Sequence, residues 1–247
     1  MGHYDETIQS TKGQRGPCPM EIKITPKWIA IVLMSLIGCL TAIHLTLQSI
    51  RFVTGETNGL VWFFGLGADG NIPTFYSAFA IILCSALLVL IGVGDLRERK
   101  VPAAYWFGLA VIFSFLAVDE MLMLHERLIE PVRDALDTSG AFYYAWVIPY
   151  GVAVLVFVAV YLRFLMLLPR KTAALFVAAG ALFVAGAIGF EMLGGMQSQT
   201  YGNENVIYVA LQTIEEVLEM VGIALFAYAL ADYADERFDG LRLVVSS

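Results

Sequence analysis

The stretch WIAIVLMSLIGCLTAIHLTLQSI, from Trp28 to Ile50, contains no Asp, Glu, Lys or Arg. A helix needs about 20 mostly apolar residues to cross a hydrocarbon layer of roughly 30 Å, so this stretch is long enough to span a membrane. It is too long for the apolar core of a signal peptide, and no small-residue cleavage site follows it. We therefore predict a membrane helix that is retained in the chain.

Five further stretches have the same apolar character. These predicted spans are Thr74–Gly94, Ala104–Leu124, Tyr144–Leu167, Thr172–Gly194 and Val206–Tyr233. Of the 247 residues, 59% are hydrophobic and only 15% are charged, whereas roughly 25% of a soluble domain is charged. We predict an all-α fold, a polytopic membrane helix bundle of six transmembrane helices. The bundle covers residues 27–233, between a polar cytoplasmic tail at 1–26 and a cytoplasmic C-terminal tail at 234–247.

Lysine and arginine predict the orientation of these spans, because basic residues are retained on the cytoplasmic side. With the N-terminus inside, 12 of the 15 bases fall on the cytoplasmic side, and only Arg51, Arg127 and Arg133 fall on the other. We therefore predict both termini inside. The bilayer is the expected partner. Membrane-protein partners and a homo-oligomer both remain open.

Composition and motifs exclude several classes of function. The formal net charge of −7 leaves no basic face that could follow a phosphate backbone, so nucleic-acid binding is excluded. The three cysteines lie far apart without a CxxC pair, which excludes a disulfide framework and a zinc-thiolate site. The chain has no nucleophile elbow, P-loop or dinucleotide fingerprint.

Acidic residues lie where a membrane helix should have none. A charge at the bilayer centre costs about 2.5 to 3.5 kcal/mol, so such acids are candidates for function. At a rise of about 1.5 Å per residue, Asp119 and Glu191 lie about 22 and 28 Å from the inner ends of the third and fifth spans. Glu215 and Glu219 lie about 14 and 20 Å from the outer end of the sixth, so we expect these acids to share one slab toward the outer side. The candidate ligands are Asp119, Glu120, His125, Glu126, Glu191, Glu215, Glu216 and Glu219, and His44 with Gln212 forms an additional candidate polar site.

This acidic cluster has three interpretations. In the first, it binds a divalent metal ion (Fe, Mn, Zn or Mg) and supports a membrane enzyme, since carboxylates and imidazole are ligands for these metals. In the second, the acids carry protons or cations in a transporter. In the third, they shape the outer surface of a non-catalytic accessory subunit of a membrane complex. A haem b between His44 and His125 is not expected, because a lone helical histidine is more often a hydrogen-bonded structural residue.

Three motifs together resemble a family of uncharacterised bacterial multi-pass membrane proteins. They are Asn71-Ile72-Pro73-Thr74 before the second span, Asp119-Glu120 with His125-Glu126 in the third, and Glu215-Glu216-x-x-Glu219 in the sixth. The resemblance covers most of the chain, and it implies a six-span inner-membrane protein with no settled activity. Members tend to carry an extra acid just before the Asn-Ile-Pro-Thr turn. Here that stretch is Gly67-Ala68-Asp69-Gly70, so the resemblance does not support a ligand from this loop.

Overall fold

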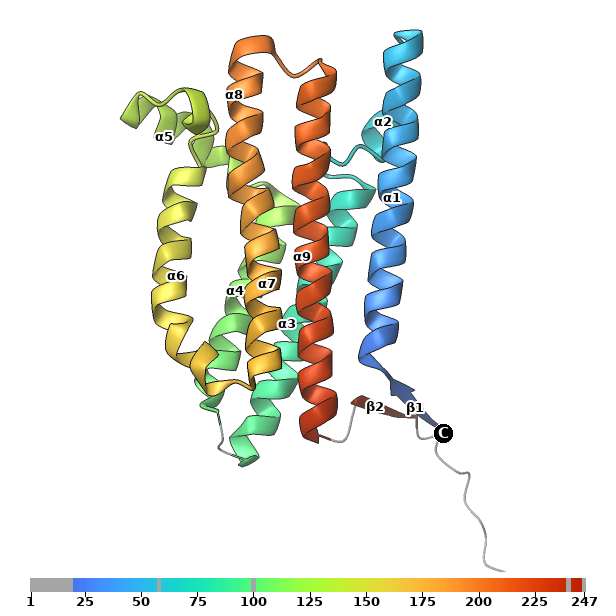
Figure 1. Cartoon of the computed structure of the whole chain (residues 1–247), viewed down its shortest axis with the longest axis vertical. Helices are drawn as coiled ribbons and strands as arrows, with labels where there is room; N and C mark the ends of the chain where they lie inside the picture. The colour runs from blue at the N-terminus through green and yellow to red at the C-terminus, as the bar shows by residue number, and fades with distance from the viewer. Residues whose placement is uncertain (1–19, 57–58, 99–100, 239–240, 246–247) are drawn as a thin grey trace, which may run out of the picture.

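The chain folds into long helices that run side by side (Figure 1). The computed structural model describes residues 20–56, 59–98, 101–238 and 241–245. The long helices are α1 (Pro26–Thr54), α3 (Ile72–Glu98), α4 (Ala103–Leu122), α6 (Val147–Leu167), α7 (Arg170–Val184), α8 (Glu191–Tyr201) and α9 (Val206–Phe238). Shorter elements are α2 (Gly59–Phe63), α5 (Ile129–Leu136), the 3-10 turns η1 (Glu126–Leu128) and η2 (Gly140–Phe142), and the π-helix η3 (Ala185–Phe190).

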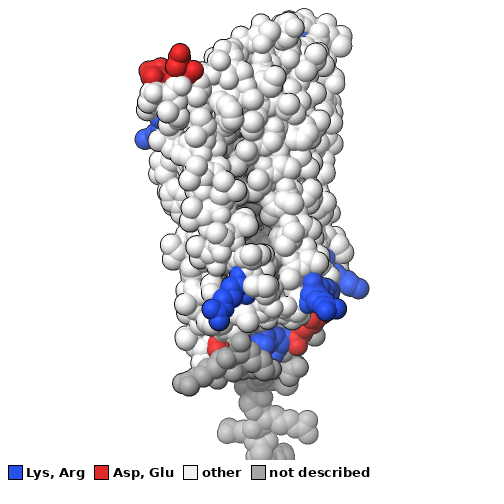
Figure 2. Space-filling view, turned by 60° about the vertical axis from the view of Figure 1, so that its left-hand side comes forward, with Lys and Arg blue, Asp and Glu red and all other residues white. Residues whose placement is uncertain are grey.

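Several of these helices are suited to a membrane. Five stretches are long and apolar enough to cross one: Pro26–Thr54, Ile72–Leu96, Ala103–Leu122, Val147–Leu167 and Arg170–Tyr201. Large apolar side chains point outward, such as Leu155 at 71% exposure and Met166 at 72%. Charged side chains lie toward the two ends of the face in Figure 2, and its broad middle is uncharged. An apolar belt of this kind is stable in lipid, so the chain is a helical membrane protein.

Helix α9 lies in the middle of the bundle. It contacts α1 on one side, α7 with η3 on the other, and α3 behind (Figure 1). Because lipid tails are as apolar as leucine, close packing holds such helices together, and small residues permit it. At Gly222, an added Cβ would lie 2.9 Å from the carbonyl oxygen of Ala179. Gly222 therefore lets α9 pack closely against α7.

Several predicted boundaries differ from the structure. The third span was predicted to end at Leu124, and α4 ends at Leu122. The fifth does not end near Gly194, because α7, η3 and α8 follow one another without interruption to Tyr201. The two segments predicted as separate tails also meet, since strand β1 (Met20–Ile24) pairs antiparallel with β2 (Leu241–Val245).

A buried ion pair joins three helices at the end of the bundle where α1 begins and α9 finishes, here called the termini end. The carboxylate of Asp95 on α3 is fully buried, and it accepts hydrogen bonds from the guanidinium of Arg237 on α9. Its other oxygen accepts the indole N–H of Trp106 on α4 at 2.7 Å. Trp106 itself is completely buried and packs edge-on against Phe164 of α6.

We expect Arg237→Met to destabilise the fold, because it leaves the Asp95 carboxylate buried without its charged partner. Loss of one partner of a buried pair typically costs about 3 to 5 kcal/mol. Chemical unfolding in mixed micelles would measure the loss, and adding Asp95→Asn should recover part of it. Arg163→Met, at an exposed position on α6, is the control. Equal stability of the two single variants would contradict the assignment.

Candidate functional site

A cavity of about 130 Å³ lies among α3, α4, α7, α8 and α9, in the half of the bundle away from the termini end. Its lining includes eight acidic residues from several elements and no Lys or Arg among the described residues. They are Asp69, Asp119, Glu120, Glu126, Glu191, Glu215, Glu216 and Glu219. His125 and Gln212 also line it. The structure therefore places all eight candidate ligands around one cavity, and adds Asp69.

The turn that follows α4 brings two of these residues to the cavity. Met123 adopts a left-handed backbone conformation with φ 50°, which ends the helix. The carboxylate of Asp119 then accepts the backbone N–H of His125 at 2.9 Å and contacts its ring Nδ1 at 3.3 Å. Because α4 ends at Leu122, this turn rather than a continuous helix brings His125 and Glu126 to the cavity that Asp119 lines.

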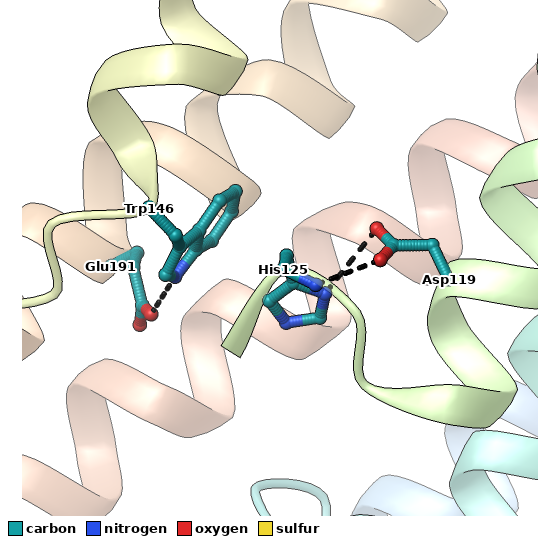
Figure 3. A network of polar contacts seen from close by, with 4 residues as sticks. All are labelled: Asp119, His125, Trp146 and Glu191. Atoms are coloured by element: carbon teal, nitrogen blue, oxygen red, sulfur yellow. Dashed lines mark hydrogen bonds and ion pairs between the residues drawn. The ribbon is translucent and has the colours of Figure 1, made fainter. Parts of the chain in front are cut away.

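A chain of polar contacts links α4 to α8 across the cavity (Figure 3). The Asp119–His125 pair begins the chain, and the imidazole lies against the ring of Trp146 with centroids 4.7 Å apart. The indole N–H of Trp146 donates to Glu191 at 2.7 Å. With Nδ1 of His125 directed at Asp119, Nε2 lies on the other side of the ring. A carboxylate that supports one nitrogen while the other stays available is typical of ligating histidines.

The deepest carboxyl groups come from α4 and α9. Glu120, Glu216 and Glu219 interact electrostatically with one another. Glu191 on α8 and Glu215 on α9 also interact electrostatically with each other. The cavity therefore concentrates groups that need a proton or a bound cation to offset their repulsion.

The π-helix η3 sets the position of α8 against α9. At Gly186 within it, an added Cβ would lie 2.7 Å from the carbonyl oxygen of Glu215 and 2.9 Å from Cγ of Glu219. Only a glycine permits this approach without a shift of one helix. π-Helical turns are rare and often occur at functional sites. The sequence contains the small residues Ala185, Gly186, Ala187 and Gly189 here, but it does not indicate that the helix changes from α to π.

Aromatic residues close the cavity toward the termini end. Phe113 lies seven residues before Glu120 on α4, and Phe226 lies seven residues after Glu219 on α9. Each phenylalanine is therefore about 10 Å farther along its helix than the glutamate, and on the same face. Their rings stack with centroids 4.7 Å apart, and the ring of Phe176 packs against Phe226 at 4.6 Å. The acidic lining does not continue through this layer.

The mouth of the cavity holds three groups with shifted pKa values. Asp69 and Glu126 lie at the mouth, and partial burial of their carboxyl groups raises the pKa of both. Burial alone would lower the pKa of His125. The carboxyl groups of Asp119, Glu126 and Glu120 outweigh burial, so the pKa of His125 is raised above its ordinary value near 6.5.

The two residues of the additional polar site have different roles. His44 is buried, its Nδ1 accepts the N–H of Leu66 at 3.1 Å, and its Nε2 contacts the hydroxyl of Thr213 at 3.0 Å. Both ring nitrogens are therefore used within the fold, and His44 does not line the cavity. Gln212 does line it, and its amide donates to the carbonyl of Gly67 at 3.0 Å. That bond ties the loop of Asp69 to α9.

The acidic side chains line one cavity, but they do not converge on a single point within it. Within the described ranges, no three His, Cys, Asp or Glu residues form a group that could hold a metal ion. Their donor types are nevertheless those of a metal site, since the cavity offers carboxylate oxygens and one imidazole nitrogen. Rotation of glutamate side chains into the cavity is the movement that would bring such donors together.

Fold and site together define a helical membrane protein with an acid-lined cavity inside its bundle. Within that class, the chain belongs to the family described as Domain of unknown function (DUF8692), which matches residues 28–233. The matched range begins in α1 and ends in α9, so it includes every residue of the cavity. No curated protein and no solved structure matches the chain.

We expect Gly186→Ala to destabilise the bundle by about 1 to 3 kcal/mol, the usual range for overpacking. The added methyl group would push against α9 at Glu215 and Glu219. Gly189→Ala is a matched control in the same π-helix, because nothing lies within 4 Å of its added Cβ. Unfolding in mixed micelles compares the two. An equal loss of stability in Gly186→Ala and Gly189→Ala would contradict the close approach of Gly186 to α9.

The raised pKa of His125 predicts a pH dependence of stability. A group whose pKa is raised by folding adds stability below its unfolded pKa, and that stability is lost as the pH rises through the folded pKa. Between pH 6 and pH 9, with a chelator present, the melting temperature of the wild type should therefore fall more steeply than the melting temperature of His125→Gln. Parallel curves for the two proteins would show that His125 does not gain a proton-dependent interaction on folding.

Proposed function

We propose that the chain is a six-span protein of the bacterial inner membrane with both termini in the cytoplasm. In this arrangement α9 is the sixth span, since its 33 residues extend about 50 Å, more than the roughly 30 Å of a hydrocarbon core. The bias of Lys and Arg toward the side of the termini supports this orientation. The cavity then lies in the outer half of the membrane.

We propose further that the cavity binds a divalent metal ion and is the active site of an enzyme that acts at the outer leaflet. One observation carries this proposal. Eight acidic residues and one histidine surround a single cavity of about 130 Å³ whose described lining includes no Lys or Arg. Carboxylate oxygens with imidazole suit Mn, Fe, Mg and Zn. A bound dication would also offset the mutual repulsion of the acids.

The geometry divides the acids into ligands and supports. Glu120, Glu216 and Glu219 are the proposed carboxylate ligands, because they are deepest and interact with one another. His125 would contribute Nε2. Asp119 would support it by holding Nδ1, the arrangement that orients histidine ligands in metal sites. These roles narrow the eight candidates to four donors.

The chemistry follows from these donors. A divalent ion in such a site polarises an oxygen of a substrate or lowers the pKa of a bound water. Glu191 and Glu215 line the same cavity, and we assign to this pair of carboxyl groups the exchange of a proton with the reacting group. The aromatic layer of Phe113 and Phe226 excludes water from the side of the termini.

Elemental analysis of the detergent-purified protein, prepared without chelators, tests the proposal. We expect about one or two equivalents of a divalent metal in the wild type and at least a tenfold weaker affinity in Glu120→Gln, Glu216→Gln. This double variant keeps side-chain size and removes two proposed donors. Glu56→Gln, Asp134→Asn removes two exposed acids elsewhere and should retain the metal. A wild type that binds no added metal would overturn the proposal.

A proton-coupled transporter is the second candidate, and the eight acidic residues around one cavity, with no Lys or Arg in its described lining, favour it. A transporter needs a continuous path, and the stacked Phe113 and Phe226 rings oppose one. Proteoliposomes that carry a pH gradient separate the two functions. Proton flux that is lost in Glu219→Gln would favour transport, whereas metal binding without flux would favour the enzyme.

A further inference from the structure

A second hollow lies on the surface at the mouth of the acidic cavity. This groove has a volume of about 360 Å³ and is formed by η1, α5, the segment before α6 and the end of α8. Its lining residues are Glu126, Arg127, Ile129, Glu130, Arg133, Tyr143, Tyr144, Ser198 and Asn203. Glu126 lines both the groove and the acidic cavity. A molecule bound in the groove would therefore lie next to the cavity mouth.

The groove contains two of the three arginines on this side of the predicted bundle. The third, Arg51, forms an ion pair with Glu204. Arg133 is half-buried, lies over the ring of Tyr143 at 4.7 Å and donates one N–H to the Tyr143 carbonyl. Arg127 is exposed, and no ion pair to it occurs among the described residues. Guanidinium N–H groups in such positions suit the oxygens of a phosphate.

The same groove carries matching negative charge. Glu126 and Glu130 line it beside the two arginines, so its formal charge is balanced. A purely anionic ligand would meet two carboxylates there. A ligand with both a phosphate and an ammonium would instead find a partner for each, and the Tyr143 and Tyr144 rings could also accept the ammonium on their faces.

The position of the groove fits a lipid rather than a soluble ligand. Helix α5 leaves the bundle sideways above α6 (Figure 1), and charged side chains are visible in that region at the upper left of Figure 2. Large apolar side chains on α5 and η2 are exposed near the groove residues in sequence, with Leu136 at 56% exposure and Phe142 at 43%. Charged groups beside exposed apolar ones are typical of a segment at the membrane interface.

We propose that the groove binds the zwitterionic headgroup of a phospholipid, with Arg127 and Arg133 on the phosphate and Glu130 on the ammonium. The apolar rim at Leu136 and Phe142 would contact the acyl chains. This proposal rests on the membrane placement proposed above, but it does not depend on a metal in the cavity. Lipid binding and metal binding can therefore fail separately.

Native mass spectrometry of protein from mixed micelles tests the proposal with two lipids of equal chain length. The probes are dioleoyl phosphatidylethanolamine, which is zwitterionic, and dioleoyl phosphatidylglycerol, which is anionic. We expect the wild type to retain the ethanolamine lipid in preference. Arg127→Gln should reduce its retention roughly tenfold, the loss expected for a charge-assisted hydrogen bond. Arg163→Gln, at an exposed position on α6, should change nothing.

Glu130→Gln provides a second variant that does not disturb Arg133 or its contact with Tyr143. Because it removes the proposed partner of the ammonium and keeps both arginines, it should shift retention toward phosphatidylglycerol. Retention unchanged in both Arg127→Gln and Glu130→Gln would overturn the proposal. Displacement of the lipid by an equal concentration of glycerophosphoethanolamine would also overturn it, since the ligand would then be a soluble phosphoester.

Discussion

The crowding of carboxyl groups around one small cavity is the constraint on which the rest of the structure depends. In a medium of low dielectric their repulsion is weakly screened, so each needs a partner. The indole N–H of Trp146 donates to Glu191, and the backbone N–H of His125 in the turn after α4 donates to Asp119. The same demand explains why four helices, rather than two, contribute to the site: α4, α8 and α9 supply acids, and α7 leads into the glycine that lets α8 approach.

The fold was largely predictable, because apolar runs of sufficient length have few alternatives in a membrane. The ends of the helices were not predictable, because they depend on contacts between residues that are distant in sequence. The third span stops where Asp119 caps the turn at His125, which spacing alone does not indicate. The fifth predicted span continues as a helix past Gly194 and Gly195. Gly195 lies close to Tyr143 and Tyr144, so it permits a helix contact instead of breaking the helix.

That acids of these spans would lie together was predictable for a related reason, since acids within apolar spans are costly and stand out in a sequence. Asp69 does not stand out in the sequence, because it lies in a polar loop. It reaches the cavity only when Gln212 ties that loop to α9. Asp95 was missed because its partner Arg237 is far away in sequence. His44 was selected by residue type, and only the structure shows that Leu66 and Thr213 use both of its nitrogens.

The π-helix at Ala185–Phe190 has a consequence for the register of α8. A π-helical turn holds one residue more than an α-helical turn, so it acts as a single-residue insertion within a continuous helix. Each residue in an α-helix turns the chain by about 100°. If the segment lost that residue, every side chain beyond it would rotate by about this angle, and Glu191 would leave the cavity. The insertion therefore determines which face of α8 meets the acids of α9.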